Sequence, residues 1–356
     1  MNPNTGNRQQ QGLSLIELMI ALLIGSILVL GLAQVFGASR AAYQLSEGMA
    51  RTQENGRFAM DYLQRDIRMA GHFGCINDQA RRQAAGVFTS HFAAGGPLDF
   101  GYSIRGYENS SPTGITLNPA RIAGTDSIVL RFLRGNAIPV MSIDTSNPAA
   151  PAVMVDPAKW NALRDSGVAS PEIFGVADCS YADVFAAASV NPATGKGVAP
   201  ATADLGRFGT NPGGGPTMLH RAEAIVYYIG NGAGGRPSLW RARLNGSAAV
   251  TSEELVEGVE NLQFRYGMDQ NVATDPTGFM ATQGTATDVG TTDLAWRRVG
   301  QVQVAMLLSS PGPASSTQAT QVTPTLLGAS ASLPADGRYR TVYENTIALR
   351  NRLYGN

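Results

Sequence analysis

The chain has 356 residues, and its 27 Lys and Arg balance 27 Asp and Glu, so that the formal net charge is zero. This balance argues against a nucleic-acid binder, because such proteins rely on a basic surface. Only 15% of the residues are charged, and the 41 Gly and 19 Pro indicate many turns and irregular connections. Two Cys and three His exclude a disulfide-dense scaffold and an all-cysteine metal cluster, and they leave little material for acid–base chemistry. We expect no cofactor.

The amino-terminal segment contains two different environments. Residues 1–12 are polar (MNPNTGNRQQQG), and residues 13–36 are almost wholly apolar (LSLIELMIALLIGSILVLGLAQVF). At about 1.5 Å of rise per residue, a helix over the apolar run would span a hydrocarbon core of roughly 30 Å. A secretory signal is disfavoured, because its apolar region is usually about 7–15 residues long and ends at a small-residue cleavage site. An ordinary membrane anchor and a buried core helix remain as alternatives.

Glu17 is the only charged residue in the apolar run. A carboxylate costs about 2.5–3.5 kcal/mol at the centre of a membrane on insertion scales, so it calls for a compensating partner. Gly12 at the end of the leader, Leu13, Glu17 at the fifth position after it and the string GLSLIELMIALLIG together resemble the class III signal of type IV pilins. The resemblance implies that a prepilin peptidase cleaves between Gly12 and Leu13 and methylates the new amino terminus. It also implies that Glu17 pairs with an amino-terminal amine during filament assembly. Leu13 departs from the Phe that is most common in the family, which bears on the efficiency of methylation.

A helical pattern continues over residues 37–70. Apolar and small residues recur there at steps of three and four, which predicts one buried stripe along a helix. The stripe comprises Leu45, Met49, Thr52, Gly56, Ala59, Leu63, Ile67 and Ala70. Because no Pro occurs between Pro3 and Pro97, we expect one continuous helix, with a first half that crosses a membrane and a second half that packs on a globular domain. Gly25 and Gly31 in the first half are expected to allow close packing of neighbouring helices.

Residues 71–356 form the predicted globular part, where short apolar runs alternate with turn residues. The expected strands are Ser127–Leu133, Ala224–Ile229, Leu239–Leu244, Asn261–Met268, Gln301–Leu308 and Arg340–Leu349. Partial alternation in NLQFRYGM and QVQVAMLL is typical of antiparallel strands with one wet face. The Gly- and Pro-rich stretches 191–216 and 309–334 suggest long surface loops. The predicted fold class is therefore α+β, with a long N-terminal helix on an antiparallel β-sheet domain with long loops.

The two cysteines, Cys75 and Cys179, lie 104 residues apart, the first just beyond the predicted helix. If the globular part lies outside the cytoplasm, a disulfide is the favoured interpretation, because such a compartment is oxidising. It would attach the end of the helix to the sheet domain. Two free thiols, or a metal site formed with His72, are the alternatives.

The globular part carries a second resemblance. In chain order, the strings DIRMAGHFGC, DCSYADVF, ELVEGVENLQFRYGMD, VGQVQVAMLLSS and YENTIALRNRL look like the landmarks of the PilW family of minor pilins. The resemblance implies a type IV pilin-like fold and a structural rather than enzymatic subunit, which helps to prime type IV pilus assembly, lies in or at the tip of the pilus and supports twitching motility and adhesion. The implied partners are other minor pilins, the major pilin and the prepilin peptidase. The implied location is the inner membrane, with a periplasmic C-terminal domain, and then the pilus.

Two other functions remain open. A minor pseudopilin of a type II secretion system would share the leader and the helix. A pilus-tip adhesin or glycan-binding module would use the long loops and exposed aromatic side chains. The aromatic candidates are Trp160, Trp240, Trp296, Tyr227, Tyr228 and Tyr266, of which we expect most to lie in the core or in strands.

Two local motifs suggest ligand sites that their context does not support. The glycines of IGNGAGGR, residues 229–236, have the spacing of a dinucleotide loop, but Pro237 and a second predicted strand follow, which indicates a hairpin. Asp269, Asn271 and Asp275 have spaced oxygen ligands of the kind that calcium prefers. The terminal acidic ligand and the central Gly of a calcium loop are missing, so we expect no metal there.

Overall fold

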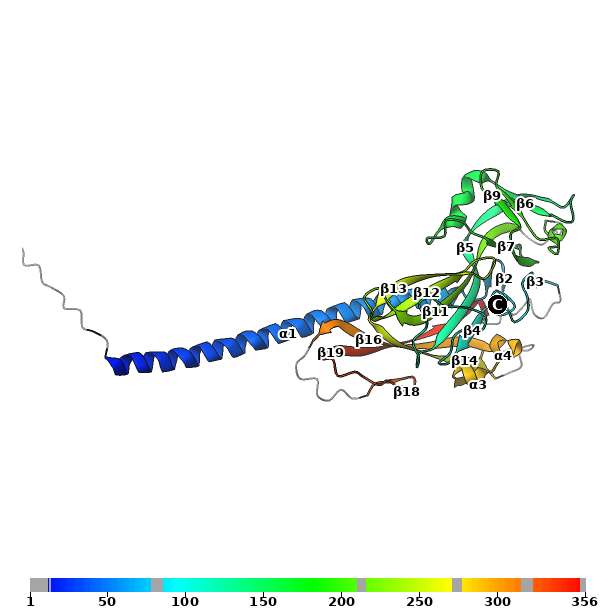
Figure 1. Cartoon of the computed structure of the whole chain (residues 1–356). Coiled ribbons are helices and arrows are strands. Elements are labelled where there is room, and N and C mark those ends of the chain that lie inside the picture. The colour runs from blue at the N-terminus through cyan, green and yellow to red at the C-terminus, as the bar shows by residue number, and fades with distance from the viewer. Residues whose placement is uncertain are drawn as a thin grey trace, which may run out of the picture.

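The molecule consists of one long helix and a β-rich body at its carboxy-terminal end (Figure 1). The computed structural model describes residues 12, 14–77, 86–209, 216–270, 277–314 and 323–352. The helix, α1, runs without interruption over 55 residues, from Leu15 to Met69. The prediction of one continuous helix is therefore correct. Leu13, Asn271 and Asp275 lie outside the described residues, as does the leader apart from Gly12.

The larger of the two main sheets has eleven strands among the described residues. Its order is β3 (Phe88–Ser90), β8 (Ala182–Ala186), β7 (Ile173–Ala177), β11 (Met218–Asn231), β5 (Ser127–Asp144), β6 (Ala152–Val155), β10 (Lys196–Val198) and β9 (Ser189–Asn191). Off this path, β4 (Ile104–Tyr107) pairs with β5, while β12 (Pro237–Leu244) pairs with β11 and with β13 (Val250–Glu257). The pair β3–β8 is parallel and the other pairs of this sheet are antiparallel.

The second main sheet is antiparallel and packs directly on α1. Its order is β15 (Met280–Gly284), β14 (Val259–Asp269), β16 (Val299–Pro313) and β19 (Arg338–Ala348). The short elements are β1 (His72–Phe73), β2 (Ile76–Asn77), β17 (Thr325–Leu326), β18 (Ala329–Ser330), α3 (Ala286–Val289), α4 (Asp293–Arg297), η1 (Pro157–Arg164), η2 (Leu205–Arg207) and η3 (Arg350–Arg352).

One hydrophobic core joins α1 to both sheets. Its members come from the buried stripe of α1, including Leu63 and Ile67, from one face of β5 and β11, and from the inner face of β14, β16 and β19. The next residues along β5 face a second core on the other side of the large sheet, so that Leu130 belongs to the first core and Val129 to the second. Burial on both faces explains why the start of β5 is a continuous apolar run rather than an alternating one.

The far part of β5 and one face of β7, together with β6, β9, β10 and η1, form a separate lobe with its own core around Trp160 and Phe174 (Figure 1, green, top right). The prediction that residues 191–216 form an exposed loop is wrong for the part that the structure describes. Leu205 and Phe208 are buried in this core, and β10 continues the sheet. The prediction for residues 309–334 is also partly wrong, because β16 extends to Pro313.

The predicted strands agree well with the observed ones. Each of the six lies on an observed strand, namely β5, β11, β12, β14, β16 and β19. The glycine-rich segment after β11 is the turn of a β11–β12 hairpin, where Gly235 has a φ of +72° that favours glycine. The rejection of a dinucleotide loop at this position is confirmed.

Candidate assembly interface

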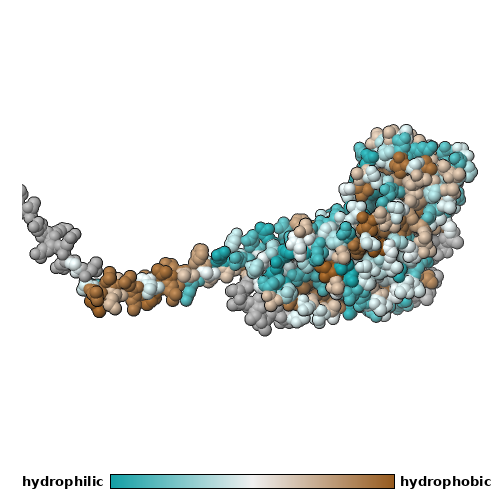
Figure 2. Space-filling view, viewed as in Figure 1, coloured by the Kyte–Doolittle hydropathy of each residue, from teal (hydrophilic) through white to brown (hydrophobic). Residues whose placement is uncertain are grey.

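The first half of α1 projects from the body with its apolar side chains uncovered. The large hydrophobic residues from Leu15 to Phe36 are each between 51% and 78% exposed. Figure 2 shows them as a brown rod that leaves the mixed surface of the body. The helix is long and apolar enough to cross a membrane, and its most hydrophobic window is not buried within the chain. Burying one such side chain is favourable by about 1.5–3 kcal/mol relative to leaving it in water. We therefore expect this surface to be covered by lipid or by other proteins.

Glu17 lies at the start of this helix and caps it. Ser14 is the N-cap residue, and its hydroxyl accepts a hydrogen bond from the backbone N–H of Glu17 at 3.2 Å. The Glu17 carboxylate accepts in turn from the backbone N–H of Ser14 at 3.0 Å. This reciprocal capping box satisfies two backbone donors that a helix leaves free, and it holds the carboxylate at the first turn of α1.

Three small residues and one larger one lie on one face of the apolar half. Ala21, Gly25 and Ala33 are in line with the larger Val29 at a spacing of four residues, and together they border an open groove. Ser26 beside them donates to the carbonyl oxygen of Leu23 at 2.8 Å, so its hydroxyl does not need water. Apart from the backbone of the helix itself, no atom of the described residues lies within 4 Å of a side-chain carbon added at Gly25 or Gly31, so both positions can contact another helix.

The second half of α1 uses glycines differently, for contact with the sheet. A Cβ at Gly56 would lie 2.6 Å from the ring of Tyr343 on β19, and one at Gly48 would lie 3.2 Å from Ser310 on β16. Gly48 is buried at the start of this face, whereas Met49, which was predicted to be buried there, is only half-buried. The predicted positions from Thr52 to Ile67 are all buried. These two glycines therefore set how closely the helix approaches the sheet.

Asp66 is a buried carboxylate on this stripe that the sequence analysis missed. It is 2% exposed and accepts hydrogen bonds from the Tyr227 hydroxyl at 2.6 Å and from Arg241 Nη1 at 3.2 Å. The pKa of Tyr227 is raised well above its usual value, mainly because the hydroxyl is buried and secondly because Asp66 is negatively charged. Burial acts to lower the pKa of Arg241, but its contacts with Tyr227, Glu253 and Asp66 raise it further than burial lowers it, so the guanidinium stays charged. A lone acid among apolar positions at helical spacing is the sequence signal for this group.

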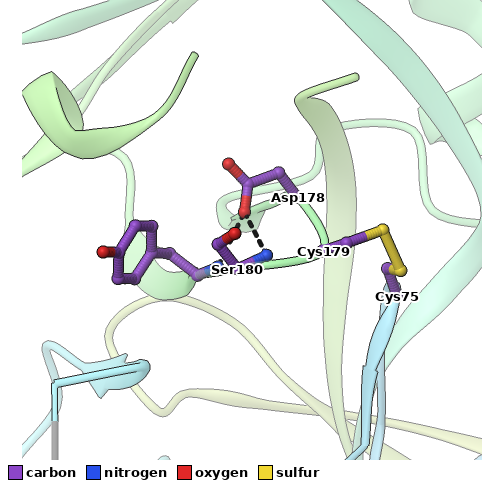
Figure 3. The surroundings of a disulfide bond; sticks show 5 residues. Cys75, Asp178, Cys179 and Ser180 are labelled. Atoms are coloured by element: carbon purple, nitrogen blue, oxygen red, sulfur yellow. Dashed lines mark hydrogen bonds between the residues drawn. A yellow bond between two sulfur atoms is a disulfide. The ribbon is translucent and has the colours of Figure 1, made fainter. Parts of the chain in front are cut away.

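A disulfide joins the end of the helix to the large sheet (Figure 3). Cys75, in the β1–β2 turn that follows α1, is bonded to Cys179, in the β7–β8 turn. Next to it, one oxygen of Asp178 accepts from the backbone N–H groups of Ser180 and Tyr181, each at 2.7 Å, which fixes the turn that presents Cys179. The predicted pairing is confirmed, and the alternatives of free thiols or a metal site at these cysteines are wrong.

The aromatic residues considered for ligand stacking do not form a surface. Trp160, Trp296, Tyr227, Tyr228 and Tyr266 are each at most 2% exposed, and Trp240 is half-buried. These six residues belong to the core or pack against it, as expected from the sequence, and they do not form a stacking surface.

The described part of the suggested calcium loop is held by ordinary hydrogen bonds. Asp269 accepts from the backbone N–H groups of Thr277 and Gly278 at 2.9 and 2.6 Å. No group of three potential metal ligands occurs among the described residues.

Comparison with known families gives two matches. The model of the prokaryotic N-terminal methylation motif matches residues 7–33, and that of Type IV Pilus-assembly protein W matches residues 226–351. Together these are the matches of a PilW-family type IV pilin. No curated protein and no solved structure matches the chain.

The two matches fall on the parts of the molecule that carry the interface. The methylation motif begins at residue 7 and covers most of the exposed half of α1, and the PilW match extends from the middle of β11 to η3. It includes β14, β16 and β19, on which the second half of α1 packs, and excludes the strands of the separate lobe. Both families are components of pili rather than enzymes. The motif and the apolar helix together indicate membrane anchoring, interaction with other pilins and recognition by a prepilin peptidase.

Proposed function

We propose that this chain is a minor pilin that helps to prime type IV pilus assembly and is incorporated in or at the tip of the pilus, where it supports twitching motility and adhesion. The observation that carries the proposal is the uncovered apolar half of α1, which follows a prepilin motif and is joined to a PilW-type body. In this proposal residues 1–12 are the leader, 13–36 cross the inner membrane and later enter the filament core, and 37–70 connect this helix to the periplasmic body of residues 71–356.

The proposed processing leaves Glu17 as the only charged side chain of the filament-core helix, next to a new positively charged amino terminus. The prepilin peptidase cleaves after Gly12 and methylates Leu13. A carboxylate among packed apolar helices is costly until it meets a positive group, so Glu17 favours the register in which it lies beside an amino-terminal amine. The membrane holds the subunit until its apolar surface transfers to neighbouring pilins and the major pilin.

The test combines the mass of the amino-terminal peptide with recovery in sheared pili. We expect the wild-type chain, expressed with a prepilin peptidase in piliated cells, to begin at Leu13 with one added methyl group and to be recovered in the pilus fraction. Glu17→Ala and Glu17→Gln should both be cleaved but should be depleted from the pili at least about tenfold, which corresponds to about 1.4 kcal/mol of lost preference.

The two Glu17 variants separate the charge from the helix cap. Gln can maintain the capping box with Ser14, whereas Ala cannot. Normal recovery of Glu17→Gln with loss of Glu17→Ala would show that the cap matters and the charge does not. An uncut chain, or a chain cut after Phe36, would contradict the pilin function itself.

A further inference from the structure

The strand β13 offers an unpaired edge next to α1. Among the described residues it pairs with β12 alone, so the other side of its backbone carries free N–H and C=O groups. Only at its last residue does α1 supply a partner, where the Asn55 side chain donates to the carbonyl oxygen of Glu257 at 3.1 Å. Such an edge is a template for an added strand.

The acidic side chains of β13 do not protect this edge. Glu253 accepts from Arg241 Nε at 2.6 Å and contacts Arg243 Nη1 at 2.7 Å, both on β12. Glu254 accepts from the Ser238 hydroxyl at 2.7 Å, also on β12. Both carboxylates are therefore drawn back over their own sheet, whereas free charges that discourage pairing would point outward.

A groove lined by both apolar and charged side chains lies between α1 and β13. Its volume is about 520 Å³, and its walls include Phe58 and Tyr62 from α1, Leu255 and Val256 from β13, and Pro311 from β16. Phe58 is 45% exposed, Tyr62 and Leu255 are half-buried and Val256 is buried. The groove therefore places partly exposed apolar side chains next to the edge of β13 that has no paired strand among the described residues, a combination that an extended peptide can use.

The charges of the groove define the partner further. Glu257 pairs with Arg236 at 3.1 Å, and Glu47 pairs with Arg51 at 3.0 Å. Glu54, on the α1 wall, has no ion partner among the described residues. The Arg57 guanidinium lies 5.4 Å from the centre of the Phe58 ring, so charges of both signs border the groove. A Lys or Arg of a partner would be matched by Glu54 rather than by the already paired Glu257.

The groove is continuous with the exposed part of α1. A second recess, which includes Gln44 and Gly48, shares Arg51 and Pro311 with it and extends it toward the apolar half. A subunit that packs against the apolar half therefore lies beside the groove.

We infer that this groove receives an extended segment of a neighbouring pilin-type subunit, which adds to β13 as a further strand. Alternate apolar side chains of the segment cover Phe58 and Leu255, and a Lys or Arg lies near Glu54. The inference rests on the proposed function, because it specifies which surface of the subunit contacts its neighbour.

The test is photo-crosslinking in piliated cells with the full chain. The photoreactive residue p-benzoylphenylalanine replaces Phe58 in one variant and Gln53 in a matched control. Gln53 is exposed on the same helix, but five residues earlier and so on a different face, and it does not border the groove. We expect an adduct at position 58 that maps to a β-forming segment of a pilin-type subunit, and no such adduct at position 53. Adding Glu54→Lys should lower the yield about two- to fivefold, as expected for loss of an exposed ion pair.

The outcomes distinguish this inference from the proposed function. Recovery of the processed chain in sheared pili without an adduct at position 58 overturns the strand addition and leaves the pilin function intact. Equal adducts at both positions, an adduct to the α1 helix of a neighbour, or an adduct only to a protein outside the pilin class also overturns it. The expected adduct on a chain that is absent from pili would support the groove and contradict the proposed location.

Discussion

At the scale of single residues, the attachment of α1 depends on one buried carboxylate. Asp66 gains the Tyr227 hydroxyl and the Arg241 guanidinium from two adjacent strands, β11 and β12, so that one side chain of the helix is bound to two strands at once. Breaking a buried ion pair is costly because the charge left behind has already lost its water. Arg241 retains Glu253, which limits the cost.

Replacing this carboxylate should loosen the helix from the body. We expect Asp66→Ala to lower the free energy of unfolding by roughly 3 kcal/mol. The control is Asp61→Ala, on the same helix, because Asp61 forms only an exposed pair with Arg65 at 2.7 Å. Its effect should stay below about 0.5 kcal/mol. Urea unfolding of the full chain in detergent micelles measures both variants, and equal effects would contradict the role assigned to Asp66.

At the scale of elements, the sequence predicts what local periodicity determines. The apolar stripe of α1 and the six strands were predictable, because they depend on helical spacing and on short apolar runs. β13 was not predicted, since its sequence VTSEELVE carries three Glu. Two of these, Glu253 and Glu254, are satisfied by partners on β12 that only the fold brings near. The separate lobe was missed for a similar reason: Leu205 and Phe208 are isolated in a Pro- and Gly-rich segment and form a core only with distant strands.

The candidate interface was predictable to a different extent in its two halves. The apolar helix, Glu17 and the prepilin motif are local features, so the sequence alone indicated them. Gly56 was predicted as part of the stripe, but the reason for a glycine there is the ring of Tyr343, 287 residues further along the chain. The groove beside β13 combines residues of α1 with Leu255 and Pro311, which lie far along the chain from that helix, and no local pattern signals it.

The disulfide connects two elements that no other feature of the sequence links. The chain between Cys75 and Cys179 closes a loop with a sequence separation of 104. In the chain-entropy model a loop of about 100 residues contributes about 4.7 kcal/mol, and measured losses are typically about 2–5 kcal/mol. We expect the double variant Cys75→Ala, Cys179→Ala to lose about 2–5 kcal/mol in urea unfolding. Reduction of the wild-type chain should reproduce this loss, and the reductant should not affect the double variant.

At the scale of the whole molecule, the helix, the large sheet and the separate lobe meet at one place. Both β5 and β11 pass from the main body into the lobe, and β11 carries a bulge between His220 and Ala222 at this passage. His220 Nδ1 lies 2.9 Å from the carbonyl oxygen of Arg134 on β5, which makes Nδ1–H the donor. A side-chain carbon added at Gly74, which lies beside Cys75 and has a φ of +76°, would be 3.0 Å from Ala177 Cβ and 3.5 Å from His220 Nε2, so the turn that follows α1 lies close to the imidazole.

The position of His220 predicts how acid affects the assembled body. Burial lowers its pKa below 6.5, and the hydrogen bond to Arg134 only partly offsets this shift. Between the folded pKa and 6.5 the unfolded chain therefore binds more protons than the folded one, so stability rises with pH in this window and is lost as pH falls through it.

The test is urea unfolding of the full chain in detergent at pH 7.5 and at pH 5. We expect the urea concentration at the unfolding midpoint to decrease when the pH is lowered from 7.5 to 5. The decrease should be smaller in His220→Gln, whose amide can still donate to the carbonyl oxygen of Arg134. Comparing the two chains removes the contribution of the other titrating groups that they share. Parallel pH profiles for both chains would show that His220 does not carry this dependence. A smaller slope in the variant would place the acid-sensitive contact where helix, sheet and lobe join.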